Sequence, residues 1–226
     1  MLFRSLRLVN LELLEPKIYL EIHSDGSTNI PKPHATLAGF DIFALMVEKL
    51  KISRGLFQLD QRPIGLDTEL DNFALTAGYS LRRDSYRAQL TYQNGRVQLG
   101  KDTWNYGLNL LVEILRNEMR VEKLMISWNR SKLEAEGVLR DFKSPQVTLT
   151  YGGLLDLLSL KQFYPDIRNT QGLANFNGKL EYAQKMWKTE GTLAGKKLSL
   201  NTVKVDQFST QYSFEPSRAH FEKIKI

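Results

Sequence analysis

The sequence predicts a mostly β protein: an elongated, curled antiparallel sheet with one short helix. Apolar and polar residues alternate along most of the chain, and turn-forming residues separate the alternating stretches. The clearest stretch is 207–214, where the apolar-side positions are Phe208, Thr210, Tyr212 and Phe214. Side chains on a strand point alternately to its two faces, so each such stretch has one apolar and one polar face.

The amino-acid composition of the chain excludes several classes of function. The 226 residues suffice for one large β domain or two small ones. With 42% hydrophobic and 25% charged residues, the chain is not generally disordered. The formal charge of +6 is spread along the chain without a basic cluster, so nucleic acid is not an expected partner. The absence of cysteine excludes disulfides, thiolate metal sites and cysteine nucleophiles.

The sequence holds no apolar run of the roughly 20 residues that a membrane span requires. Arg4 and Arg7 interrupt the apolar start, so no signal-peptide core is expected there. Residues 221–226 end within an alternating pattern. We therefore expect one β-groove segment, 1–226, of a longer protein, with 1–46, 47–120 and 121–226 as candidate units.

Strands are expected on both sides of Pro16, over residues 5–22. Asp25-Gly26 predicts a turn, and the stretch 29–39, with its prolines, predicts a loop. The next strand starts at Val47, with a turn expected near Arg54-Gly55. The alternation resumes at Phe57 and again over 66–75.

Asn94-Gly95 gives the clearest hairpin signal. Leu90 and Tyr92 precede this dipeptide, and Val97 follows it. Asn-Gly accepts the positive φ angles of a type I′ turn, so two antiparallel strands joined there are predicted.

Two later segments are ambiguous by periodicity. Residues 104–115 fit both helical and strand spacing, and we interpret them as a strand because their neighbours are strands. Residues 154–163 form a dense leucine patch ending before Pro165, which favours a short helix. The rest of the chain alternates as strands, over 131–139, 147–151, 176–182, 187–196, 198–202 and 207–214. Val-Glu-Lys-Leu occurs at both 47–50 and 121–124, which favours a stacked array of hairpin units.

No residue pattern indicates catalysis. His23, His34 and His220 are far apart in sequence, and none has a carboxylate at ligand spacing. Glu134 and Glu136 share a strand face, but no other reactive group accompanies them. We expect no enzyme activity, no cofactor and no metal.

Several short motifs carry a family resemblance. Residues 16–22 form a P-x-I-x-L strand, followed by Asp25-Gly26 and Asn29-Ile30. This stretch resembles the N-terminal region of AsmA-like proteins, a family that includes TamB of the translocation and assembly module. Residues 47–55, 131–139 and 153–157 are similar to later strands and turns of the family, as are the glycines Gly172, Gly178, Gly191 and Gly195.

The resemblance implies a protein that spans the periplasm from an inner-membrane anchor and forms a β-taco groove with an apolar interior. It also implies phospholipid transfer between the inner and outer membranes, outer-membrane biogenesis and protein secretion. Phospholipid acyl chains would then be the cargo, and an Omp85-class outer-membrane barrel the protein partner. The anchor helix and the domain that meets this barrel have no counterpart in the 226 residues.

The predicted groove residues share the apolar parity of their strands and would contact acyl chains; they are Leu6, Leu8, Ile18, Leu20, Ile22, Leu90, Tyr92, Leu133, Leu149, Phe176, Leu180, Leu193, Leu200, Phe208 and Tyr212. Ordinary packing in the core of a sheet would give the same pattern. A structural or adhesive β-solenoid or sandwich segment of a surface protein is therefore the alternative. In that case a second sheet would seal the apolar face.

Overall fold

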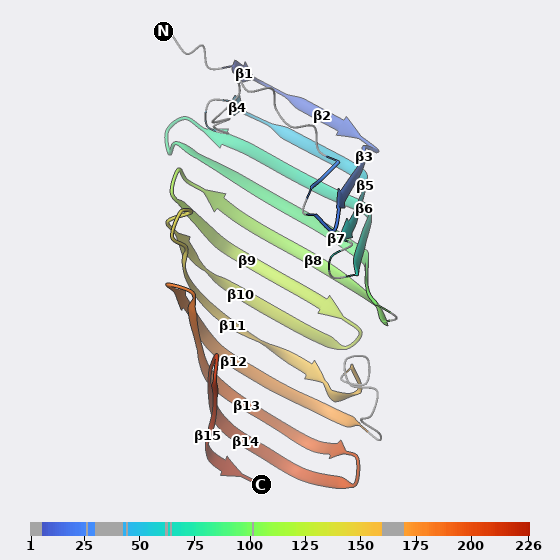
Figure 1. The fold of residues 1–226 in the computed structure, drawn as a ribbon, viewed down its shortest axis with the longest axis vertical. Helices are drawn as coiled ribbons and strands as arrows, with labels where there is room; N and C mark the ends of the chain where they lie inside the picture. The colour runs from blue at the N-terminus through green and yellow to red at the C-terminus, as the bar shows by residue number, and fades with distance from the viewer. Residues whose placement is uncertain are drawn as a thin grey trace. The chain divides into compact units, whose positions relative to one another are not determined.

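The computed structural model describes residues 6–25, 27–29, 43, 45–61, 63, 65–100, 102–159 and 170–226. Nearly all of them lie in strands, and none of them lies in an α-helix (Figure 1). The predicted mostly β class is thereby confirmed. The chain forms two compact units, 1–116 and 117–226. The finer subdivision at 46/47 and 120/121 stays a prediction.

In the first unit, four long strands pair antiparallel with their sequence neighbours: β5 (Leu50–Gln61), β6 (Leu66–Ser80), β7 (Ser85–Leu99) and β8 (Asp102–Ile114). The expected strand over 104–115 is thus confirmed. The shorter strands before them are β1 (Leu6–Leu8), β2 (Leu11–Leu14), β3 (Lys17–Ile22) and β4 (Leu45–Val47).

The short N-terminal strands depart from the antiparallel pattern. Strands β2 and β3 both pair parallel to β5, and β1 pairs parallel to β4. The turn expected at Asp25 is present, since Ser27 donates from its backbone nitrogen to Asp25 Oδ1 at 2.9 Å. The loop expected over 29–39 lies almost wholly outside the described residues.

Two predicted turns are wrong. Arg54-Gly55 lies inside β5 and Asn94-Gly95 lies inside β7. Each dipeptide coincides with an interruption of strand register, and Arg54 has a φ of 53°. Asn72, with a φ of 58°, lies between them on β6. We interpret these features as β-bulges, which place an extra residue in a strand and bend it.

The core of the first unit lies beside these bulges. Its buried members are Ile52, Leu70, Phe73 and Tyr92, each with 5–8% of its surface exposed. Gly95 is part of this packing, because a Cβ there would lie 2.6 Å from Cε2 of Tyr92. Asn-Gly therefore makes room for an aromatic ring here. The chain turns instead at residues 81–84, between β6 and β7.

The second unit is an antiparallel meander in which each strand pairs with the next (Figure 1): β9 (Glu118–Trp128), β10 (Ser131–Arg140), β11 (Gln146–Asp156), β12 (Gln171–Ala183), β13 (Met186–Leu200), β14 (Val203–Glu215) and β15 (Arg218–Lys225). The strands expected over 131–139, 147–151, 176–182, 187–196 and 207–214 are confirmed. The separate strand expected over 198–202 is wrong, because β13 runs on to Leu200 and residues 201 and 202 form the turn into β14.

The helix predicted over 154–163 is wrong in its described part. Leu154 and Leu155 lie in β11, which ends at Asp156, and residues Leu157–Ser159 form a single 3₁₀ turn. Leu154 pairs with Lys132 on one side and with Asn175 on the other. Pairing on both edges of the strand overrides the local leucine pattern. Residues 160–163 lie outside the described part.

Candidate apolar groove

The strand register of the second unit gathers its apolar residues on one face. Residues directly opposite each other in paired strands point to the same side of a sheet. One row across β10 to β13 consists of Leu133, Gly153, Phe176 and Leu193. Other rows on the same face hold the pair Leu149 and Leu180 and the pair Gly195 and Phe208. We call this side the apolar face of the second unit.

The seven predicted groove residues of this unit whose side chains are described all lie on that face: Leu133, Leu149, Phe176, Leu180, Leu193, Phe208 and Tyr212. Each is half-buried. All seven strands of the unit belong to one sheet. The side chain of Leu200 lies outside the described part.

The predicted groove residues of the first unit occupy different environments. Tyr92 is 6% exposed, and Leu90 packs against the same core cluster. Ile18, Leu20 and Ile22 lie on β3, where Ile18 is opposite Phe57 and Leu20 is opposite Leu59. Leu8 is opposite Val47 in the two-stranded pair of β1 and β4. The side chain of Leu6 lies outside the described part.

Two tyrosines meet over the middle of the apolar face. Tyr151 on β11 and Tyr212 on β14 lie in one row with Gly178 and Gly191 between them. Their phenolic oxygens are 2.8 Å apart. A Cβ at Gly191 would lie 2.7 Å from the Tyr212 hydroxyl oxygen and 2.0 Å from the Asn177 carbonyl oxygen. The two glycines therefore leave the space that the tyrosine side chains occupy.

This tyrosine pair has further hydrogen-bond partners. The Tyr212 hydroxyl donates to the Asn177 carbonyl oxygen at 3.2 Å, and the Tyr151 hydroxyl also bonds to Thr189 Oγ1. Burial, followed by the hydrogen bond with Tyr151, raises the pKa of Tyr212 well above its usual range. Both effects disfavour the phenolate, so Tyr212 stays neutral at physiological pH.

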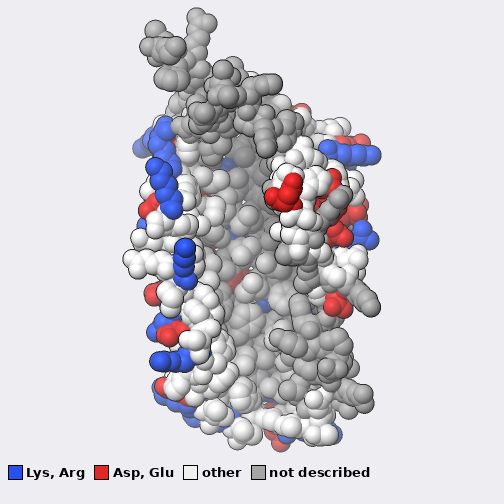
Figure 2. Space-filling view, in the orientation of Figure 1, with Lys and Arg blue, Asp and Glu red and all other residues white. Residues whose placement is uncertain are grey.

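The opposite face of the second unit is charged. Lys132 pairs with Glu134, Lys179 with Glu181 and Lys188 with Glu190. These pairs join residues two apart on one strand, which therefore share a face. In the lower part of Figure 2, over the strands of this unit, charged side chains lie mainly at the margins. The middle of that view is hollowed and largely uncharged.

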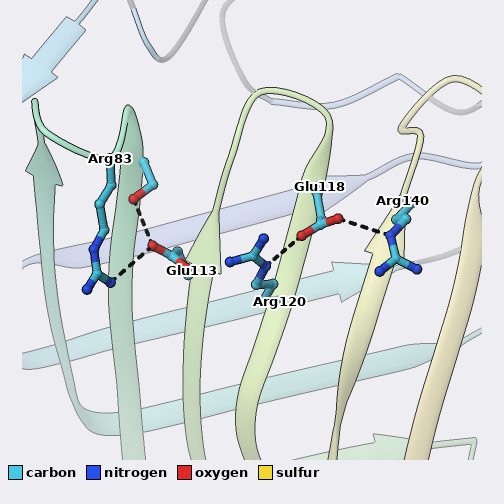
Figure 3. Close-up of polar contacts among 6 residues, drawn as sticks. Arg83, Glu113, Glu118, Arg120 and Arg140 are labelled. Atoms are coloured by element: carbon cyan, nitrogen blue, oxygen red, sulfur yellow. Dashed lines mark hydrogen bonds and ion pairs between the residues drawn. The ribbon is translucent and has the colours of Figure 1, made fainter.

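Glu118, the first residue of β9, forms ion pairs with Arg120 on the same strand and with Arg140, the last residue of β10 (Figure 3). Arg120 Nε lies 2.6 Å from Glu118 Oε1, and Arg140 Nε lies 3.0 Å from Oε2. Arg120 and then Arg140 lower the pKa of Glu118 below its ordinary value. In the first unit, buried Glu113 accepts a hydrogen bond from Ser85 Oγ at 2.9 Å, and Arg83 Nη1 lies 3.6 Å away (Figure 3).

Sequence reasoning missed several residues of the apolar face. Tyr151 shares the face of Leu149, and Leu124 lies opposite Ala135 in the same row. The alternation over residues 147–151 puts Tyr151 on the same side as Leu149, so it was sufficient to predict Tyr151 as a groove residue. Gly178 and Gly191 gave a second signal, because a glycine inside a strand often marks a place where another group comes close to the strand backbone.

In the described part of the chain, no group of three metal-ligating side chains could hold an ion. None of its helical segments is long and apolar enough to cross a bilayer. Comparison of the sequence and structure with protein-family models, curated proteins and solved structures yields no match.

Proposed function

We propose that this chain is a groove segment of an AsmA/TamB-like envelope protein, which shields phospholipid acyl chains in transit between the inner and outer membranes. The observation that carries the proposal is the apolar face of the second unit. Seven half-buried apolar or aromatic side chains share that face. Each acyl methylene moved from water onto such a face contributes roughly 0.8 kcal/mol.

A conducting surface should hold its cargo reversibly and without strong selection. Leucine, phenylalanine and alanine side chains offer dispersion contacts and no fixed polar anchor, which suits acyl chains of different lengths. The charged side chains of the opposite face would keep that face of the sheet in contact with water. In the full-length protein, the segment would lie in the periplasm below an inner-membrane anchor. Contact with an Omp85-class barrel, and the resulting role in outer-membrane protein assembly, would use other regions.

One observation favours the structural alternative. In the first unit, Ile52, Leu70, Phe73 and Tyr92 bury one another on the apolar side of the strands. Such packing fills space that cargo would need and is typical of a protein core. A structural or adhesive β segment remains the second candidate.

The experiment compares Leu180→Asp with Thr150→Asp. Leu180 lies on the apolar face, whereas Thr150 lies on the opposite face, across from Glu136 and Lys179. Each variant is purified from bacteria, and the lipids bound to it are extracted and quantified by mass spectrometry. A carboxylate among acyl chains is strongly unfavourable, so Leu180→Asp should lower bound lipid about fivefold or more.

Thr150→Asp should leave bound lipid unchanged. Thermal unfolding of both variants separates lost binding from lost folding. The proposal fails if the wild-type chain carries no lipid, or if Leu180→Asp retains it fully.

A further inference from the structure

Strand β15 is the last strand in the order of the sheet, and among the described residues only β14 pairs with it (Figure 1). All eight of its residues are exposed. Phe221 and Ile224 are its large apolar residues, with 48% and 57% of their surface exposed. The second edge of β15 thus has no paired strand in the described part of the chain. Such an edge is a template for a further strand.

One hydrogen bond of the hairpin shows which residues present their peptide groups at this open edge. Thr210 Oγ1 on β14 donates to the carbonyl oxygen of Glu222 at 2.9 Å, so the peptide groups of Glu222 point toward β14. In an antiparallel ladder, successive residues turn their N–H and C=O groups to opposite edges. Ala219 and Phe221 therefore turn theirs to the open edge.

The two halves of β15 differ in how well they are protected against pairing. Lysines, prolines and bulges protect the edge strands of natural sheets. Lys223, with a φ of 51°, lies at an interruption of the register with β14, and Lys225 follows it. Residues 218–222 include no lysine, no proline and no residue with a positive φ. This stretch is therefore the part of the edge that suits pairing with another strand.

The charges of residues 218–222 are complementary to themselves in the antiparallel direction. When His220 lies opposite His220 of a second copy, Glu222 lies opposite Arg218 of that copy, and Arg218 lies opposite its Glu222. Opposite charges at facing positions stabilise paired strands. Within its own chain, Arg218 forms no ion pair with the described residues, whereas Glu222 Oε1 lies 2.8 Å from Nε2 of His220.

The same register also matches the backbone and the apolar side chains. Phe221 falls opposite Ala219 of the second copy, and both residues turn their peptide groups to the shared edge. Backbone hydrogen bonds can therefore form at this pair and at its symmetry mate. Both side chains belong to the apolar face, because Phe221 lies opposite Tyr212 and Ala219 lies opposite Phe214. The apolar faces of the two copies would then lie on the same side of the joined sheet.

We propose that two copies of the chain pair antiparallel through residues 218–222 of β15, about a two-fold axis at His220. This inference goes beyond the proposed function and does not depend on lipid binding. The contact is short, so the dimer is weak and its fraction rises with protein concentration.

The first test reverses the facing charges and measures association of the full chain by sedimentation equilibrium. Arg218→Glu brings two pairs of glutamates together in the dimer, and Glu222→Arg brings two pairs of arginines together. Each single variant should associate about tenfold or more weakly than the wild type. Lys188→Glu is the control, because it reverses a charge on β13, two strands away from β15, and it should leave association unchanged.

Rescue of association separates charge pairing from damage to the fold. The double variant Arg218→Glu/Glu222→Arg restores opposite charges at both positions and should regain the wild-type affinity. An equimolar mixture of the two single variants also places opposite charges at both positions. It should therefore associate like the wild type. Far-UV circular dichroism of each variant checks that the strands are retained.

A single cysteine tests the register, because the chain has no cysteine of its own. Across the proposed axis, His220 faces its counterpart in a non-hydrogen-bonded pair, whose Cα atoms are about 4.5 Å apart, a separation that a disulfide can span. His220→Cys should therefore form a disulfide-linked dimer under mild oxidation. Gln211→Cys is the control, because Gln211 is exposed and shares the face of Glu222 but lies one strand further from the open edge.

A chain that stays monomeric at every concentration would overturn the proposal. Association that both charge reversals leave unchanged would overturn it as well, and would move the contact to another surface. The same conclusion would follow if Gln211→Cys cross-linked as fast as His220→Cys.

Discussion

The hydroxyl oxygens of Tyr151 and Tyr212 lie 2.8 Å apart, although strands β12 and β13 separate the two residues in the sheet. Both side chains reach toward each other over Gly178 and Gly191. Four strands are thus tied together by one side-chain contact in addition to their backbone ladder. The contact also places two hydrogen-bonded hydroxyl groups among the leucine and phenylalanine side chains of the apolar face.

The hydroxyl of Tyr212 should therefore contribute to stability. Tyr212→Phe removes the hydrogen bonds to Tyr151 and to the Asn177 carbonyl oxygen while keeping the ring. We expect a loss of about 1 kcal/mol in the free energy of unfolding, measured by urea denaturation. Tyr182→Phe is the matched control, because no hydrogen bond joins the Tyr182 hydroxyl to the described residues. Equal effects of the two substitutions would contradict the role of the tyrosine pair.

The glycines below the tyrosines should not tolerate a methyl group. In Gly191→Ala, the new Cβ would lie 2.0 Å from the Asn177 carbonyl oxygen, so strand β12 or β13 must shift. We expect destabilisation of about 1–3 kcal/mol by the same denaturation assay.

Gly152→Ala provides the control within the same sheet. Its Cβ would meet no atom closer than 3.4 Å. An alanine there should be neutral or stabilise by up to about 1 kcal/mol, since it restricts the unfolded chain. A Gly191→Ala variant as stable as Gly152→Ala would rule out the crowding at residue 191.

The ion pairs of Glu118 should make stability depend on pH. Arg120 and Arg140 lower its pKa in the folded protein below the ordinary value of 4.5. The stabilisation is therefore present above that value and is lost as the pH falls through the folded pKa. Glu118→Gln should lower the melting temperature at about pH 6 and change it less at about pH 3.

Glu136→Gln serves as the comparison, because Glu136 is exposed and forms no ion pair with the described residues. Its effect on the melting temperature should be small at both pH values. A Glu118→Gln deficit that persists unchanged in acid would exclude ion pairing as its origin.

Alternation in the sequence was sufficient to identify the strands and the apolar side of the second unit. Leu133, Phe176 and Leu193 were placed on one face by parity, and consecutive hairpins then brought them into one row. The parallel pairing of β3 with β5 was not predictable in this way, because no local pattern encodes which distant strand becomes a neighbour. The leucines at 154 and 155 were misread for a related reason, since pairing on both edges outweighed local periodicity.

Asn94-Gly95 shows how a strong local signal can be overridden by packing. The dipeptide predicts a tight turn, yet Gly95 lies within β7 between Leu70 on β6 and Tyr106 on β8. If the Tyr92 ring is the reason for this glycine, the two positions should be energetically coupled. Gly95→Ala alone should destabilise the chain by about 1–3 kcal/mol, because the new Cβ would lie 2.6 Å from the ring.

A double-mutant cycle with Tyr92→Leu tests that coupling. Leucine lacks the ring atoms that the alanine methyl would meet, so Gly95→Ala should cost much less in the Tyr92→Leu background. Urea denaturation of the four proteins should give an interaction free energy of at least about 0.5 kcal/mol. Additive effects would instead indicate that Gly95 is required by its backbone conformation in the bulge, and not by the space that Tyr92 occupies.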